Sequence, residues 1–407
     1  MMNTPKIRFS GYTEAWEQRK VLDLLIQPVT DGPHETPELV EEGVPFISVD
    51  AIVDNKIDFN RKRGNISEEY DELCCKKYKP QLHDVYLVKS GSTVGKVAIV
   101  ETTDRFNIWS PLAAMRCGEK THPYFLYDLL QTKDLQAQVA DKASNGTQPN
   151  LSMRELEKFP VSVPLNLDEQ KKIGEYFRNL DNLITLHQRK CDQTKKLKKY
   201  MLQKMFPQNG ELYPEIRFEG FTKAWEQRKF GELYEVNNER NKDLIGYDKT
   251  FSIATMTYKG EGNGAADSSL SNYKVLRIGD IAFEGHTNKE FRYGRFVAND
   301  IGDGIMSPRF SALRPLFQMP VSFWKYYIHF EPIMKRKLIC STKAGTMMNE
   351  LVTADFFEQS ILVPSIDEQT KIGEFLSSLD HLITLHQRKC DDLKEIKKYM
   401  LQNMFAV

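Results

Sequence analysis

The segment SGSTVGK at residues 90–96 is the part of this sequence closest to a phosphate-binding loop. Such a loop holds phosphates with backbone amides and a lysine, and the serine or threonine that follows binds magnesium. Here one residue is missing between the first glycine and the GK pair, and Val97 stands in place of the hydroxyl. The segment also lies between two predicted strands, so a hairpin turn is favoured over a nucleotide site.

The segment LITLHQRKC occurs at residues 183–191 and again at residues 382–390. Within each copy a histidine and a cysteine are spaced four residues apart, so His187 and Cys191 with His386 and Cys390 could supply four metal ligands if the copies met. The six cysteines form no CxxC pair, and no histidine pair accompanies them at zinc spacing. We expect reduced thiols and no metal, with the histidines acting as polar residues that fix the register of a helical seam.

Motifs for two kinds of catalysis are missing from the sequence. A methyltransferase would need a cofactor loop and an Asn/Asp-Pro-Pro-aromatic motif, and a nuclease would need clustered carboxylates with a lysine. No such tetrapeptide and no convincing carboxylate cluster occurs. We therefore predict no catalytic residues and no cofactor, although an enzyme that uses the glycine-rich hairpin is kept as a hypothesis to be tested.

Composition is that of a globular protein with about two domains. The 407 residues include 56 basic and 56 acidic side chains, and 41% of the residues are hydrophobic. This balance excludes a uniformly cationic protein but leaves room for local basic patches. No apolar run is long enough to span a bilayer, and the first twenty residues lack the apolar core of a signal peptide, so we expect a cytoplasmic protein without a membrane partner.

An internal repeat decides the architecture. IRFSGYTEAWEQRK at residues 7–20 returns as IRFEGFTKAWEQRK at 216–229, and residues 168–206 return at 367–405 with 28 of 39 aligned positions identical. The segments at about 26–140 and 235–340 share only faint similarity. This order predicts two modules with a shared frame and diverged cores.

The repeated frame is helical. Apolar positions spaced four and three apart from Ile173 and Ile372 form a heptad seam, and we expect Asp168 and Asp367 to cap the helices. Each helix would be about 58 Å long and would need a partner, for which the other copy is the nearest candidate. Antiparallel pairing in full register would bring His187 and His386 together. The predicted seam residues are Ile184, His187, Cys191, Ile383, His386 and Cys390.

The modules themselves have mixed patterns. Residues 83–100 predict a strand, a turn and a strand, and residues 274–285 with 294–298 predict the same. Residues 122–139 and 321–338 predict helices. Each module is therefore expected to be mixed α and β.

Taken together, these features resemble the specificity subunit of type I restriction–modification systems. The resemblance covers essentially the whole chain and rests on the duplicated segments VPLNLDEQKKIGEYF at 163–177 and VPSIDEQTKIGEFL at 363–376. It implies an α+β fold with two target recognition domains separated by two long antiparallel coiled-coil helices in a pseudo-twofold arrangement. The implied domains are residues 1–165 and 207–365, and the implied spacer helices are residues 166–206 and 366–407.

The resemblance also implies a function without catalysis. Each recognition domain would read one half of a bipartite target in double-stranded DNA. The helices would fix the spacing of the half-sites and dock two methyltransferase subunits, and restriction (translocase) subunits would join the full complex. A scaffold with two interaction modules that bind no DNA is the alternative.

Candidate DNA contacts are exposed basic and amide side chains in the variable segments, because these residue types hold phosphates or read base edges. They are predicted as a group: Arg61, Lys62, Arg63, Ser92, Thr93, Lys96, Asn145, Gln148, Tyr258, Lys259, Asn288, Lys289, Arg292 and Lys343.

Overall fold

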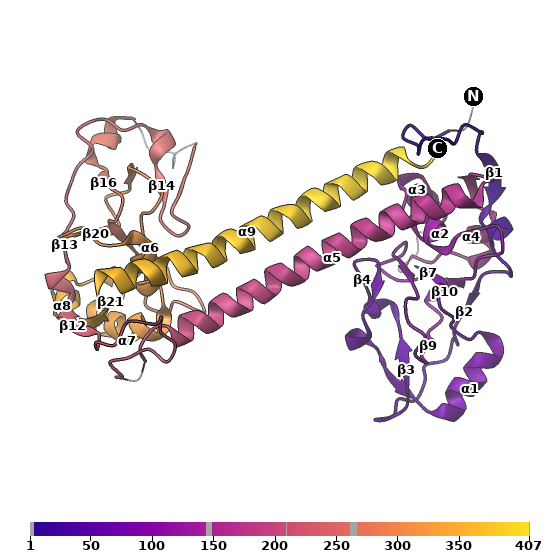
Figure 1. The fold of residues 1–407 in the computed structure, drawn as a ribbon, viewed down its shortest axis with the longest axis horizontal. Helices are drawn as coiled ribbons and strands as arrows, with labels where there is room; N and C mark the ends of the chain where they lie inside the picture. The colour runs from indigo at the N-terminus through magenta and orange to yellow at the C-terminus, as the bar shows by residue number, and fades with distance from the viewer. Residues whose placement is uncertain (1–3, 144–148, 209, 261–266, 407) are drawn as a thin grey trace. The chain divides into compact units, whose positions relative to one another are not determined.

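The computed structural model describes residues 4–143, 149–208, 210–260 and 267–406 (Figure 1). The chain divides into two units, one formed by Met1–Gln188 with Arg388–Val407 and the other by Arg189–Gln387. Each unit therefore contains one β-rich module and about half of each long helix. The predicted residues Asn145 and Gln148 lie outside the described residues.

The first unit is built on a four-stranded antiparallel sheet in the order β2-β10-β7-β8. Its strands are β2 (Thr30–Asp31), β7 (Val85–Val88), β8 (Val97–Ile99) and β10 (Leu112–Met115). The predicted strand–turn–strand at residues 83–100 is confirmed, because Val85 pairs with Ile99 across β7 and β8. The unit's other strands are β1 (Glu17–Lys20), β3 (Val44–Ile47), β4 (Ile52–Val53), β5 (Lys56–Ile57), β6 (Gly64–Ile66), β9 (Asn107–Ile108) and β11 (Pro160–Val163).

The first unit also contains short helices. They are α1 (Glu68–Lys77), α2 (Pro123–Leu129), α3 (Lys133–Lys142) and α4 (Met153–Lys158), with 3-10 turns η1 (Val21–Leu24), η2 (Val49–Ala51) and η3 (Phe59–Arg61). The helix predicted at 122–139 is in fact two helices, α2 and α3. The Thr132 hydroxyl donates to the carbonyl of Leu129 (2.7 Å) at the break between them. This local hydrogen bond competes with continuation of the helix.

The second unit repeats the plan with the sheet order β13-β20-β17-β18. Its strands are β12 (Glu226–Lys229), β13 (Tyr234–Val236), β14 (Phe251–Ser252), β15 (Thr257–Tyr258), β16 (Lys274–Leu276), β17 (Ile281–Glu284), β18 (Arg295–Ala298), β19 (Gly304–Met306), β20 (Ser311–Pro315), β21 (Thr342–Lys343), β22 (Glu350–Leu351) and β23 (Ser360–Val363). Its short helices are α6 (Val321–Tyr327), α7 (Glu331–Ser341), α8 (Thr353–Glu358), η4 (Phe230–Glu232), η5 (Tyr247–Lys249) and η6 (Asp267–Asn272).

Two sequence predictions for the second unit need correction. The strand–turn–strand predicted for residues 274–285 with 294–298 is confirmed for β17 and β18, but β16 is not part of it and pairs with β19. The helix predicted at 321–338 is also divided, into α6 and α7. Pro332 lies in the first turn of α7, where its missing N–H costs nothing.

The repeated segments form the long helices α5 (Leu167–Lys204) and α9 (Ile366–Asn403), drawn as single continuous helices in Figure 1. Their first turns are not capped by Asp168 and Asp367 as predicted. The Asn166 side chain accepts a hydrogen bond from the amide of Asp168 (2.8 Å), and the Ser365 hydroxyl accepts one from the amide of Glu368 (3.4 Å). Each cap lies two residues earlier than predicted, because the helix begins earlier. Among the described residues, no helix is both long and apolar enough to cross a membrane.

Within each unit the two helix segments pack antiparallel. In the first unit Cys390 contacts the carbonyl of Ile184 and the side chain of Gln188, and Lys397 pairs with Asp181 at 2.8 Å. Residue numbers thus rise along one helix as they fall along the other. The same contacts recur in the second unit, where Cys191 lies against Ile383 and Gln387, and Lys198 pairs with Asp380 at 2.6 Å.

The predicted seam residues differ in burial. Both cysteines are fully buried, whereas the isoleucines and histidines of the set are half-buried. The end of each helix enters a module core. Phe405 lies 5.9 Å from the ring of Phe177 in the first unit, and Phe206 lies 4.9 Å from the ring of Tyr327 in the second. Each module is therefore closed by the helix that comes from the other half of the sequence.

Candidate nucleic-acid interface

A buried glutamate joins each module to the start of its helix. Glu169 accepts two hydrogen bonds from Arg8 (2.6 and 2.8 Å) and one from the Trp16 indole (3.4 Å). In the second unit Glu368 accepts the same bonds from Arg217 (2.7 and 2.7 Å) and Trp225 (3.4 Å). Both glutamates are 1% exposed. We name these two groups the clamps, and they explain why the repeats retain an IRF, a WEQRK and a DEQ segment.

The glutamine that follows each clamp glutamate is also buried and bonded. Gln170 donates to the carbonyl of Pro164 (3.0 Å), and Gln369 donates to the carbonyl of Pro364 (2.9 Å). Each also binds the helix pair that precedes it in its module: Gln170 accepts from the His122 amide (3.0 Å) and Gln369 from the Trp324 indole (3.0 Å). Buried polar groups satisfied in this way hold a module in one orientation on its helix.

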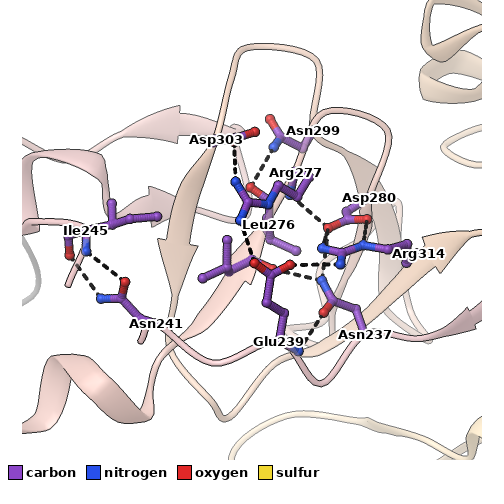
Figure 2. Close-up of polar contacts among 11 residues, drawn as sticks. Asn237, Glu239, Asn241, Ile245, Leu276, Arg277, Asp280, Asn299, Asp303 and Arg314 are labelled. Atoms are coloured by element: carbon purple, nitrogen blue, oxygen red, sulfur yellow. Dashed lines mark hydrogen bonds and ion pairs between the residues drawn. The ribbon is translucent and has the colours of Figure 1, made fainter. Parts of the chain in front are cut away.

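A second shared feature is an arginine–aspartate corner at one end of each four-stranded sheet. In the first unit Asp84 accepts two hydrogen bonds from Arg116 (2.7 Å each), and in the second Asp280 accepts two from Arg314 (3.0 and 2.8 Å; Figure 2). The hydrogen bond to Asp84 raises the pKa of Arg116 despite its burial. The sequence did not reveal either corner, although Arg116 and Arg314 end the faintly similar segments at residues 110–116 and 307–314.

The backbone of the two corners matches as well. Asp84 and Asp280 each accept from an amide three residues earlier, that of Gln81 or Arg277 (2.8 Å each). The residue just before each aspartate has positive φ, 71° at His83 and 93° at Gly279. Histidine is tolerated there although glycine is preferred.

The second corner carries an additional charged network (Figure 2). Arg277 bonds to Glu239 and to Asp303 (2.6 Å each), and Glu239 also pairs with Arg314 at 2.8 Å. Burial opposes ionisation of Glu239, but the hydrogen bonds from the two arginines hold its pKa below the usual value. The network ties the loop after β13 to the turn that precedes β19.

At the opposite end of the first sheet, the glycine-rich hairpin lies against the segment that precedes α4. The amide of Gly91 donates to the carbonyl of Pro149 (3.0 Å), and Ser90 forms a β-bridge with Asn150. Of the predicted residues here, Ser92 and Lys96 are exposed, and the buried hydroxyl of Thr93 has no hydrogen-bond partner within the described chain. The hairpin joins antiparallel strands, as the sequence predicted.

The predicted basic loop at residues 61–63 follows η3. Lys62 donates to the side chain of Asn65 (2.7 Å), and Arg61 is exposed. The guanidinium of Arg63 lies over the ring of Trp109, 4.1 Å from its centre. Trp109 was not predicted as part of the site.

In the second unit the structure brings together two segments that the sequence separates. Asn349 donates its amide to Gly285 (2.9 Å) and its side chain to the carbonyl of Arg292 (3.3 Å). A Cβ atom at Gly285 would lie 2.0 Å from the Asn349 carbonyl oxygen, so this contact requires glycine. The loop of Lys289 and Arg292, both exposed, therefore lies beside the β21–β22 hairpin.

The remaining predicted residues of the second unit have varied surroundings. Asn288 accepts from the amides of Glu290 and Phe291 (2.8 Å each), which commits its oxygen to a local turn. Lys343 pairs with Glu350 at 3.3 Å on the surface. Tyr258 donates to the carbonyl of Asp303 (2.9 Å), and Lys259 next to it is exposed. Tyr258 and Lys259 belong to the separate β14–β15 hairpin.

Comparison with known proteins assigns this arrangement to a family. The family described as "Type I restriction modification DNA specificity domain" matches residues 15–196 and 320–395. The chain belongs to this family. It is the specificity subunit of a type I restriction–modification system, the component that determines DNA specificity and does not carry the catalytic centre.

Individual relatives agree over nearly the full length. The MjaX specificity subunit of Methanocaldococcus jannaschii is 23% identical over 430 residues, covering 98% of this chain and 95% of the relative. The MjaVIII specificity subunit of the same organism is 21% identical over 366 residues, covering 83% of this chain and 82% of the relative. The crystal structure of the type I S subunit from M. genitalium matches with a TM-score of 0.65 at 14% identity, covering 99% of each chain.

The specificity subunit also has a cation cluster that the sequence did not reveal. Asp31 is fully buried and accepts from the ammonium group of Lys77, while Lys89 and His34 each lie 3.3 Å from its carboxylate. The four residues lie between positions 31 and 89 with no shared spacing. A lysine at the end of a buried strand, as at Lys89, was the one available signal. No group of three or more potential metal ligands occurs among the described residues.

Proposed function

We propose that each module reads one half of a bipartite DNA target, and that the two long helices fix the distance between the half-sites. The observation that carries this proposal is the pairing of an unchanged frame with changed loops. The hydrogen-bond lengths in the clamps and corners agree between the two units to within a few tenths of an ångström. The loops at the other end of each sheet, in contrast, differ in length and sequence. A constant frame supports constant geometry, and different loops support different base readout.

The candidate DNA contacts are exposed basic side chains on loops of the variable segments. In the first unit they are Arg61, Arg63 and Lys96, and in the second unit Lys259, Lys289 and Arg292. Cationic loops at the end of a sheet suit the DNA backbone, and arginine or lysine can bind guanine edges in the major groove. Ser92, Asn288 and Lys343 belong to the same loops and are proposed as weaker contacts.

The helices are proposed to dock two methyltransferase subunits, with restriction subunits joining the full complex. Exposed apolar side chains recur at matching positions of both helices and support such docking. They are Leu197 and Tyr200 on α5, with Ile396 and Tyr399 on α9, each 44–58% exposed. An apolar set of this kind within a lysine-rich surface favours a protein partner.

Sequencing the methylated positions in a host that expresses this subunit with its methyltransferase tests the proposal. We expect one bipartite motif with a fixed gap. Insertion of one heptad into each helix, within residues 183–191 and 382–390, adds about 10 Å and should lengthen the gap by about three base pairs. Methylation without any bipartite motif would favour a scaffold that binds no DNA.

A further inference from the structure

Arg63 differs from other arginines of the first unit in what its guanidinium contacts. Arg105 and Arg116 are committed to the buried carboxylates of Asp71 and Asp84. Arg63 has no ion pair within the described residues, and its guanidinium carbon lies over Trp109, 4.1 Å from the ring centre. Its charge is therefore held in place by an aromatic face and remains available to an external acceptor.

Hydrogen bonds hold the backbone of Arg63 and the ring of Trp109 in place. The amide of Arg63 donates to the carbonyl of Phe46 (2.9 Å), which pins the start of β6 to β3. The Trp109 indole donates to the carbonyl of Glu35 (3.1 Å), and its ring packs on the small core of Val44, Phe46 and Ile66. Because this pair is held in place before a ligand arrives, binding costs it little conformational entropy.

A guanidinium that lies over an aromatic ring keeps its N–H donors for a ligand. Stacking uses the face of the group and leaves the N–H donors at its edge unoccupied. Two parallel N–H donors match the O6 and N7 acceptors of guanine, the commonest specific contact in the major groove. A phosphate can also accept from both donors, so the test must separate a base contact from a phosphate contact.

We infer that Arg63 reads a guanine in the half-site of the first unit and that Trp109 is its positioning residue. This inference rests on the proposed function. Its place in the fold supports it, because Trp109 immediately precedes the turn whose Ser110 amide donates to Pro33 (3.1 Å) and whose Pro111 carbonyl accepts from Lys89 (2.8 Å). Arg63 thus lies at the same end of the sheet as the glycine-rich hairpin.

The test is methylated-site sequencing with Arg63→Lys, Arg63→Ala, Trp109→Phe and Trp109→Ala, each expressed with the methyltransferase. Arg63→Lys keeps the charge but loses the paired donors, so discrimination at one guanine should fall roughly 5- to 150-fold, as for loss of a bidentate contact. Trp109→Phe should retain the motif, whereas Trp109→Ala should relax the same base as Arg63→Lys. The half-site of the second unit should not change.

Arg19→Ala is the matched control, because Arg19 is an exposed arginine of the same unit paired with Glu17 on β1. Uniform loss of methylation with every base still specified would make Arg63 a phosphate contact and overturn the inference. Relaxation by Arg63→Lys with an unchanged motif in Trp109→Ala would overturn the role of Trp109. Failure of the proposed function is distinct, because the wild-type complex would then yield no bipartite motif.

Discussion

The two units of this specificity subunit can be compared residue by residue, and they agree at the base of each module while differing at the loops. Glu169 and Glu368 accept the same three hydrogen bonds, and Asp84 and Asp280 each accept from an equivalent arginine. Beyond the frame, the first unit adds a three-stranded sheet with parallel β3 and β9, whereas the second adds the antiparallel pair β16 and β19. The buried charge pairs that both units share therefore mark the parts that must not change, and the inserted elements mark the parts that can.

The clamps give the largest expected effect. Glu169→Ala leaves the largely buried guanidinium of Arg8 without its partner, and Glu368→Ala does the same to Arg217. Loss of one member of a buried ion pair costs about 3–5 kcal/mol. Chemical denaturation should show a similar loss for both variants, while Glu17→Ala in an exposed pair should change stability by less than about 1 kcal/mol. A large effect in one unit alone would show that the clamps are not equivalent.

The two units differ at one buried position of α2 and α6. Gly174 faces Phe125 and Gly373 faces Phe323, so Asp128 and Tyr326, each three residues later, are equivalent. Tyr326 donates to Asp380 (2.7 Å), but neither carboxyl oxygen of Asp128 has a hydrogen-bond partner within the described residues. Burial raises the pKa of Asp128 well above its ordinary value, with Lys397 opposing and Asp181 adding to the shift.

The raised pKa of Asp128 makes the stability of the protein depend on pH. Because the folded pKa of Asp128 exceeds the unfolded one, stability is lost as pH rises above the unfolded pKa. Asp128→Asn removes this loss and should stabilise the protein by up to about 1.4 kcal/mol for each pH unit between the two values. The difference in melting temperature between variant and wild type should therefore grow from pH 4 to pH 8. A difference that does not vary with pH would contradict the assignment, and Tyr326→Phe should show none of this trend.

Arg277 gives the smallest expected effect, because its side chain is 42% exposed. The first unit has Gln81 at the equivalent position, so the network around Arg277 is an addition to the second corner. Arg277→Ala should cost about 0.5–1 kcal/mol. Hydrogen exchange should rise in β16 and β19 and stay constant in the first unit. An equal rise in both units would show that the Arg277 network does not act on the second corner alone.

The frame could be predicted from the repeat, because a helix is indicated by the local spacing of its apolar residues. The seam and the strand–turn–strand of residues 83–100 follow from periodicity alone. The pairing of β16 with β19 does not, because short strands carry little register information and their partners lie far apart in sequence. Trp109 beneath Arg63 and the Asp31 cation cluster are likewise long-range contacts, which no local pattern encodes. The choice of individual DNA contacts from the sequence stays a prediction.

Replacement of residues 26–140 by the corresponding segment of another specificity subunit tests the central claim most directly. The methylated motif of the chimaera would be sequenced in a host that also expresses the methyltransferase. One half of the motif should change, while the other half and the gap stay as in the wild type, because the clamps and helices are untouched. A change in both halves, or in the gap alone, would contradict the account of independent readers on a constant frame.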